Sequence, residues 1–208
     1  IFAEAGSMVN MSGNVAMESQ LKGGVIAGLK RAVTGDSIFL TRFTAREGAG
    51  FVSFAGTMTG KIFPVRLSTG KEFIAQKSSF LCCEESVSLD IAFTEKLRAG
   101  LFGGEGFILQ RMTGEGTAFL HCCGDIITMD LKESEVVKVQ TGLVVGFEST
   151  VSYDIALVGG ITTALFGGEG LFVTTLTGPG KVVLQSMDLG RIAATIFPYL
   201  PRPEPKGK

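Results

Sequence analysis

The sequence contains no tryptophan and a single histidine, His121, among its 208 residues. With His121 as the only imidazole, we find no Ser-His-Asp or Cys-His-Asn arrangement in the chain. The charges are nearly balanced, with 19 basic and 20 acidic residues and a net charge of −1. A balanced chain creates no long-range field that attracts nucleic acid. We therefore expect neither an enzyme nor a nucleic-acid-binding protein.

Long hydrophobic runs are also missing. The longest stretch without a charged residue is 155–168, which contains four glycines. It is shorter than the roughly 20 apolar residues that a membrane-spanning helix needs. The sequence therefore predicts no transmembrane helix. No signal or transit peptide is visible, although the chain opens at Ile1 without a methionine.

Glycine is the residue in excess, with 29 of 208 positions, about twice the usual share of roughly 7%. The glycines separate short runs of β-branched and aromatic residues, as they do where tight turns join short strands. With 45% hydrophobic and 19% charged residues, the chain is globular. The composition therefore predicts an all-β fold.

Several sequence patterns recur along the chain. The hexapeptide Leu-Phe-Gly-Gly-Glu-Gly occurs at residues 101–106 and again at 165–170, and residues 33–44 hold a more diverged copy. Each copy leads into an apolar run and then a Gly-x-Gly turn. Recurrence at this spacing predicts three fused β repeats, at about residues 1–66, 67–130 and 131–196, within one compact domain. We expect β-sandwich units around a pseudo-threefold axis.

Individual elements follow from the residue patterns. Residues 126–131 alternate in polarity like a half-buried strand, whereas 107–109 and 171–176 are typical of more fully buried strands. The first repeat opens on a strand at 2–11 and lacks the segment that opens the other two, so we expect the native protein to extend before Ile1. A short helix is expected up to about Ile196, followed by an extended proline-containing tail over 197–208.

Short connectors, helical in part, are expected between the strands of each repeat. In the first repeat the apolar residues fall at helical spacing, and in the third the connector carries no charge at all. We predict that these apolar connectors form an interaction surface. Its expected members are Val25, Ile26, Leu29, Val158, Ile161, Leu165 and Phe166.

Four cysteines and the histidine cluster in the second repeat. They are Cys82, Cys83, His121, Cys122 and Cys123. Neighbouring residues on a strand point to opposite faces, so at most one cysteine of each pair can join a common site. Zinc sites also favour Cys-x-x-Cys spacing. We therefore favour buried thiols over a metal centre, and expect no cofactor.

Acidic residues recur at matching places in the three repeats. One set is Asp36, Glu105 and Glu169, and the other is Glu18, Asp90 and Asp154. Three carboxylates around an axis suit a hard cation such as Ca²⁺ or Mg²⁺, but an acid at a turn more commonly accepts backbone hydrogen bonds. The glycine-rich turns precede strands and no lysine follows them, so we interpret them as structural turns and not as phosphate-binding loops.

Motifs distributed over nearly the whole chain resemble the altered-inheritance-of-mitochondria, or mitochondrial-biogenesis, family. They include residues 4–11, the sequence Gly35-Asp36-Ser37, the two Leu-Phe-Gly-Gly-Glu-Gly segments, and 177–180 followed by Leu184-Gln-Ser. The resemblance implies a β-sandwich fold related to the trp RNA-binding attenuation protein. It also implies an intracellular protein, cytoplasmic in a prokaryote or mitochondrial in a eukaryote. Mitochondrial members are linked to inner-membrane organisation, and the family supplies no catalytic residues.

Together these observations predict a non-enzymatic β scaffold that acts through protein contacts and self-association as a homo-oligomer. The resemblance adds a role in membrane or mitochondrial organisation, with peripheral membrane contact as a further hypothesis. The alternative is a small-ligand or metal-binding module that uses the acidic turn residues or the Cys/His group.

Overall fold

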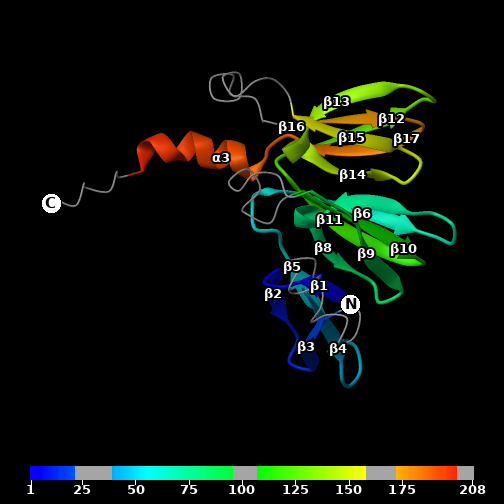
Figure 1. Cartoon of the computed structure of the whole chain (residues 1–208). Helices are drawn as coiled ribbons and strands as arrows, with labels where there is room; N and C mark the ends of the chain where they lie inside the picture. Colours follow the sequence, from blue (N-terminus) through cyan, green and yellow to red (C-terminus); the bar gives the residue numbers. More distant parts are fainter. Residues whose placement is uncertain (22–38, 96–106, 158–171, 201–208) are drawn as a thin grey trace.

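The computed structural model describes residues 1–21, 39–95, 107–157 and 172–200 (Figure 1). The predicted connector surface, from Val25 to Leu29 and from Val158 to Phe166, lies outside these residues. So do Asp36, Glu105 and Glu169. The described part consists mainly of β-strands in antiparallel sheets with little helix, so the predicted all-β fold is confirmed.

The strands form three groups along the chain, stacked one above the other in Figure 1. The first group contains β1 (Phe2–Glu4), β2 (Met8–Met11), β3 (Val15–Leu21), β4 (Phe39–Ala45) and β5 (Val52–Phe54). The second contains β6 (Gly60–Leu67), β7 (Phe73–Gln76), β8 (Phe80–Cys83), β9 (Val87–Glu95), β10 (Phe107–Gly114) and β11 (Gly116–Cys123). The third contains β12 (Ile126–Leu131), β13 (Val136–Gln140), β14 (Val144–Glu148), β15 (Ser152–Leu157), β16 (Phe172–Thr177) and β17 (Gly180–Gln185).

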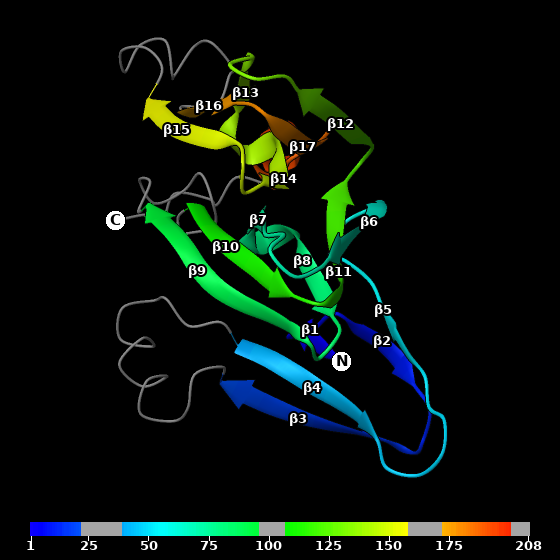
Figure 2. The same cartoon turned by 90° about the vertical axis from the view of Figure 1, so that its right-hand side faces the viewer.

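Corresponding strands pair in the same way in each group. The long hairpins are β3 with β4, β9 with β10, and β15 with β16, and in each the second strand also pairs with β1, β7 or β13. Opposite them, β2 pairs with β5, β8 with β11, and β14 with β17, each with a register shift near the start of the first strand. Figure 2 shows that β3, β9 and β15 all end towards the same side of the molecule.

Neighbouring groups are joined by strand pairing. β1 pairs with β8, with Phe2 opposite Cys83 and Ala3 opposite Cys82. β7 pairs in the same way with β14, where Ala75 lies opposite Gly146. Two six-stranded sheets therefore each contain strands of two groups. Among the described residues no strand of the first group pairs with the third, and the predicted pseudo-threefold axis is not confirmed.

Three hydrophobic clusters follow these sheets. The largest contains Phe73, Met112 and Leu120 of the second group together with Leu40 of the first group. Another is centred on Leu109, Phe147 and Leu176, and the smallest surrounds Leu81. Leu81 of β8 packs with residues of the first group, so the clusters extend across the junctions between groups.

Two expected strands differ in the structure. The strand expected over residues 2–11 is two strands, β1 and β2, separated by a turn in which Gly6 has a φ of +85°. A positive φ is available to glycine without steric cost, and this explains the break. The strand over 171–176 is β16, in which only Thr174 and Leu176 are buried, so it is half-buried and not fully buried. Residues 107–109 are buried as expected.

β6 is hydrogen-bonded to β11, so it is part of the second group. β12 is hydrogen-bonded to β17, so it is part of the third group. The predicted repeat boundaries at residues 66/67 and 130/131 fall at the ends of these two strands.

After β17 the chain forms α3 (Leu189–Ile196) and a 3-10 turn, η3 (Phe197–Tyr199), which confirms the helix expected up to Ile196. In Figure 1, α3 projects away from the stacked sheets.

Candidate functional site

The cysteines and the histidine lie on two neighbouring strands but do not converge. Cys82 and Cys83 of β8 face Phe119 and Ala118 of β11. The segment from His121 to Cys123 lies further along β11, where its other neighbour is β6. Within the part of the chain that the structure describes, no three His, Cys, Asp or Glu side chains are placed to hold a metal ion. The cysteines form no disulfide.

The thiols are held in their neutral form. Burial raises the pKa of Cys82 to about 12 and that of Cys122 to about 11. Burial also raises the pKa of Cys123, and the carboxylate of Asp188 adds to that shift. A protonated thiol is neither a nucleophile nor a metal ligand. Cys82 and Cys122, which are buried, therefore serve as small apolar side chains in the protein interior.

Three of the acidic residues that recur in the repeats are described, and they lie on outward-facing strand positions. Glu18 on β3 and Asp90 on β9 face arginines on the neighbouring strands, Arg42 and Arg111. Asp154 on β15 lies opposite Thr175. All three carboxylates are exposed. Opposite charges at directly paired positions stabilise a sheet modestly, by about 0.2–1 kcal/mol.

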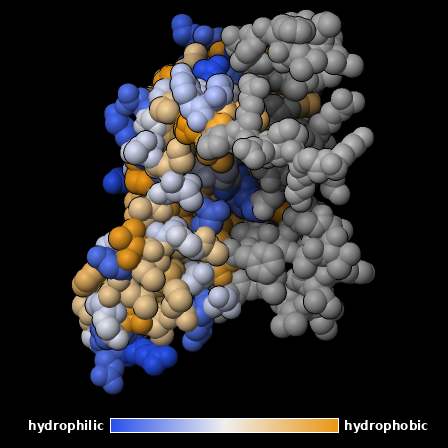
Figure 3. All heavy atoms as spheres, turned by 90° about the vertical axis from the view of Figure 1, so that its left-hand side faces the viewer, coloured by the Kyte–Doolittle hydropathy of each residue, from blue (hydrophilic) through white to orange (hydrophobic). Residues whose placement is uncertain are grey.

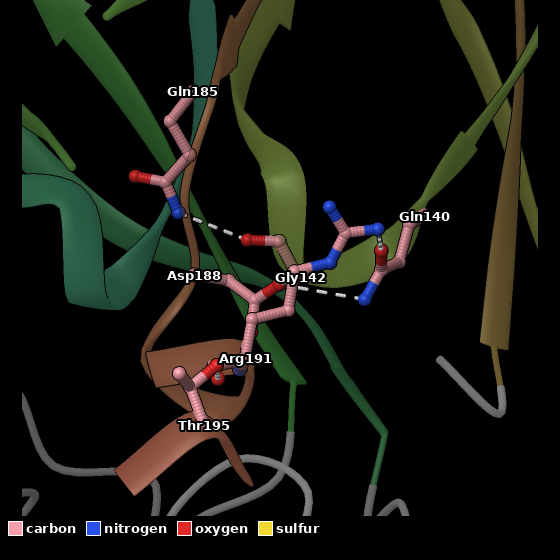
Figure 4. A network of polar contacts seen from close by, with 6 residues as sticks. All are labelled: Gln140, Gly142, Gln185, Asp188, Arg191 and Thr195. Carbon is pink, nitrogen blue, oxygen red and sulfur yellow. Dashed lines mark hydrogen bonds and ion pairs between the residues drawn. The ribbon is translucent and has the colours of Figure 1, made fainter. Parts of the chain in front are cut away.

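A polar network fixes the start of α3 to the end of β13 and to the following turn, η2 (Thr141–Leu143) (Figure 4). Asp188 caps the helix, because its Oδ1 accepts a hydrogen bond of 2.9 Å from the backbone N–H of Arg191. Its other oxygen, Oδ2, accepts from the side-chain amide of Gln140 at 3.4 Å and lies 3.6 Å from the Arg191 guanidinium. The Arg191 guanidinium also donates to Gln140. The direction in which α3 leaves the sheets is therefore set by the side-chain contacts of Asp188, Gln140 and Arg191.

A second contact ties the same region to β17. The side-chain amide of Gln185 donates to the carbonyl of Gly142 at 2.9 Å, and its carbonyl oxygen accepts from the backbone N–H of Cys123 at 2.9 Å. Gln185 is buried, so both ends of its side chain replace water with protein partners. Gln185 consequently connects β17 to η2 and to β11 of the second group.

Beyond this base, α3 and η3 carry apolar side chains into solvent. The exposed fractions are 63% for Leu189, 50% for Ile196, 75% for Phe197, 85% for Tyr199 and 53% for Leu200. We call these five residues the C-terminal apolar surface. Exposed aromatic side chains on an ordered element are typical of contact surfaces.

Sequence reasoning predicted the helix but not this surface. The available signals were an aspartate at the N-cap position and apolar residues at Leu189, Ile192 and Ile196, which is helical spacing. In the described ranges, none of the helices has the length and apolar character needed to cross a membrane.

Comparison with known proteins agrees with this architecture. The family model for mitochondrial biogenesis AIM24 matches residues 1–187. An uncharacterized protein of Streptococcus pyogenes serotype M6 is 28% identical over 211 aligned positions, which cover 97% of this chain and 82% of that protein. The crystal structure of a Streptococcus pyogenes protein superposes with a TM-score of 0.79 at 26% identity, covering 96% of this chain and 88% of the other. The chain therefore belongs to the mitochondrial biogenesis AIM24 family.

Proposed function

We propose that this protein is a non-enzymatic β scaffold that acts through contacts with further copies of itself and with other proteins. The observation that carries the proposal is the C-terminal apolar surface. Its side chains are 50% to 85% exposed although the helix beneath them is capped and fixed by Asp188, Gln140 and Arg191. Apolar side chains that are held in a defined position contribute most to the free energy of association when a partner covers them.

The scaffold proposal also fits the placement of the described polar side chains. Catalysis needs converging groups with matched proton affinities, and the raised pKa values of Cys82 and Cys122 leave both thiols protonated near neutral pH. The alternative is a metal-binding module built on the Cys/His group. It is disfavoured because these side chains do not converge. Cation binding by the acidic residues is disfavoured because Glu18 and Asp90 face arginines on the neighbouring strands.

The connectors extend the same proposal. They join the ends of the three long hairpins, and these ends lie on one side of the molecule (Figure 2). We expect Leu165 and Phe166 to contribute to self-association from this side. Peripheral membrane contact by the same apolar residues is the competing outcome, and nucleic acid is not expected as a partner because the charges are balanced.

Light scattering coupled to size exclusion tests the proposal. We expect the wild type to form a defined oligomer, and a Phe197→Ser/Tyr199→Ser double variant to have a lower mass. Met17→Thr, which changes an apolar residue that is 54% exposed on β3, is the control and should leave the mass unchanged. A Leu165→Asp/Phe166→Asp variant tests the third connector in the same assay.

Each result has a defined meaning. A monomeric wild type, or a folded double variant with the wild-type mass, would contradict self-association through the C-terminal apolar surface. Salt-resistant binding to liposomes, lost in either double variant, would favour the membrane instead. Far-ultraviolet circular dichroism of every variant ensures that a change in mass does not reflect unfolding.

A further inference from the structure

The two six-stranded sheets share one construction, and the smaller sheets are parts of it. One large sheet has the order β3-β4-β1 followed by β8-β11-β6, and the other has β9-β10-β7 followed by β14-β17-β12. The halves meet at β1 with β8 and at β7 with β14, which we call the first and second junctions. The sheet β15-β16-β13 corresponds to a first half, and β2-β5 corresponds to part of a second half. Among the described residues, β13 and β2 occupy junction positions without a partner across a junction.

The two junctions have the same register and are apolar throughout. Each contains two rows of paired residues that continue into the next strand. At the first junction the rows are Phe2, Cys83 and Ala118, and Ala3, Cys82 and Phe119; at the second they are Ile74, Phe147 and Val182, and Ala75, Gly146 and Val183. Every one of these residues except Phe119 is buried. The shared register shows which residues would meet if β13 paired with β2 of another copy.

β13 carries a lysine where both junctions have an apolar residue. Lys138 lies three residues ahead of η2, just as Ile74 of β7 lies three residues ahead of η1 (Lys77–Ser79). Ile74 is 4% exposed and Phe2, its counterpart on β1, is 7% exposed. Lys138 is exposed. Pairing in the shared register would bury its ammonium group among apolar side chains, and burying an unpaired charge is strongly unfavourable.

β2 is polar at the matching place. Asn10 lies opposite Ser53 of β5, just as Gly146 of β14 lies opposite Val183 of β17. Asn10 and Ser53 are exposed, whereas Gly146 and Val183 are buried. The strands that correspond to the two sides of a junction therefore both carry polar side chains where the junctions inside the molecule are apolar.

The segment that we expect ahead of Ile1 does not lie at this place. In the second group the strand ahead of β7 is β6, and it pairs with β11 on the edge away from β8. A strand ahead of β1 would in the same way pair with β5, on the edge away from β2. The polarity at Asn10 is thus a property of the β2 edge itself.

The polar residues lie at the two ends of the stack. In Figure 1, β13 lies at the upper end and β2 lies in the lowest group. Figure 3 shows hydrophilic residues at both the upper and the lower end of the molecule. Exposed strand edges pair readily with other chains, and lysine on an edge strand is a common protection against this. Stacked repeats likewise need polar terminal faces to stay soluble.

We propose that β13 and β2 form a latent head-to-tail interface between copies of this chain, which Lys138, Asn10 and Ser53 keep unpaired. Without these polar groups, β13 of one copy pairs antiparallel with β2 of the next in the register of the two junctions. Such a contact uses different surfaces on the two copies, so it continues into rings or filaments. The inference does not rest on the proposed function, because the C-terminal apolar surface takes no part in this pairing.

A variant with apolar residues at all three positions tests the proposal. It carries Lys138→Ile, Asn10→Ala and Ser53→Val, and light scattering coupled to size exclusion compares it with the wild type at several concentrations. We expect a mass at least about twice that of the wild type, since each step adds a whole chain. Lys138→Ile alone should change the mass in the same direction. Hydrogen exchange should show new protection at Val136–Gln140 and at Met8–Met11 in the triple variant.

Two matched variants separate the lysine from a general increase in apolar surface. Asn10→Ala/Ser53→Val retains Lys138 and should keep the wild-type mass. Lys132→Ile replaces another exposed lysine, in the turn ahead of β13, and should also keep the wild-type mass.

Returning a charge to β2 tests the partner strand. Val9 is 61% exposed, whereas Val145, at the same place in the register shift of β14, is fully buried. Val9→Asp added to the triple variant should therefore restore the wild-type mass. Phe197→Ser/Tyr199→Ser added to the triple variant should leave the head-to-tail assembly in place, because the two surfaces are separate.

The proposal is wrong if the triple variant and Lys138→Ile are folded by circular dichroism but keep the wild-type mass. It is equally wrong if either matched variant gains as much mass as the triple variant. Protection of alternate β13 amides in the wild type would show that this edge is already paired, and would also overturn it. A monomeric wild type contradicts only the proposed function, because the mass change here is measured relative to the wild type.

Discussion

Replacing Gly146 with alanine tests the junction between the second and third groups of strands. Gly146 on β14 lies opposite Ala75 on β7. A Cβ atom at this position would lie 2.5 Å from Cε1 of Phe73, 2.6 Å from the carbonyl oxygen of Ile74 and 3.1 Å from Cα of Ala75. Phe73 is 4% exposed, and the other two atoms belong to the backbone of β7. The two strands must therefore move apart to accept one methyl group.

The expected cost is about 1–3 kcal/mol, the usual penalty for forcing extra volume into a packed interior. Urea unfolding followed by circular dichroism measures this as a lower midpoint with an unchanged slope. Gly13→Ala is the matched control, because a Cβ atom there meets no heavy atom within 4 Å. We expect that variant to unfold within about 0.5 kcal/mol of the wild type. Equal stability of Gly146→Ala and Gly13→Ala would refute the close approach of β7 and β14.

Three further predictions concern the helix and the thiols. Asp188→Ala removes the N-cap bond to Arg191, so the amide protons of α3 should exchange faster, by the equivalent of about 1 kcal/mol; an unchanged rate would show that the cap does not hold the helix. Iodoacetamide at pH 8 should leave Cys82 and Cys122 unmodified in the folded protein and modify both in urea, because their pKa values are raised to about 12 and about 11. The free energy of unfolding should fall as the pH rises from about 9 towards 12, since the unfolded chain releases the Cys82 proton near its ordinary pKa of 9.0 while the folded protein retains it. Cys82→Ala should reduce this slope, and an identical slope in the variant would contradict the assignment to Cys82.

Much of the fold was accessible from the sequence because its signals are local. Glycine spacing predicted the turns, and alternation over residues 126–131 predicted β12. The short helix expected up to about Ile196 is α3. The break at Gly6 was missed because residues 2–11 carry enough apolar side chains to resemble one strand, and only the positive φ distinguishes a turn there.

Features that depend on pairing between distant strands were not accessible in the same way. The amino-acid sequence of β1 does not indicate that this strand pairs with β8 of the next group, because an apolar strand suits any partner strand equally well. The C-terminal apolar surface required knowing which face of α3 the sheets leave uncovered.

For the cysteines, the sequence predicted that neighbouring side chains point to opposite faces of a strand. Alternation along β8 and β11 sends neighbouring side chains to opposite faces, and the structure accordingly assigns Cys82 and Cys83 to different hydrophobic clusters. The sequence did not indicate how strongly burial raises their pKa values, since that depends on the layers packed around them. The connector surface, with Val25, Leu29 and Ile161 among its members, stays a prediction.

The pairing of β7 with β14 has a consequence for the order in which the protein is made. During synthesis β7 leaves the ribosome some seventy residues before β14, which supplies its second neighbour. Domains generally fold as units while the N-terminal part is made first, but here the second group cannot complete its sheet until residue 148 has emerged. In the growing chain, the β7 edge of this sheet therefore has no partner until β14 has been made.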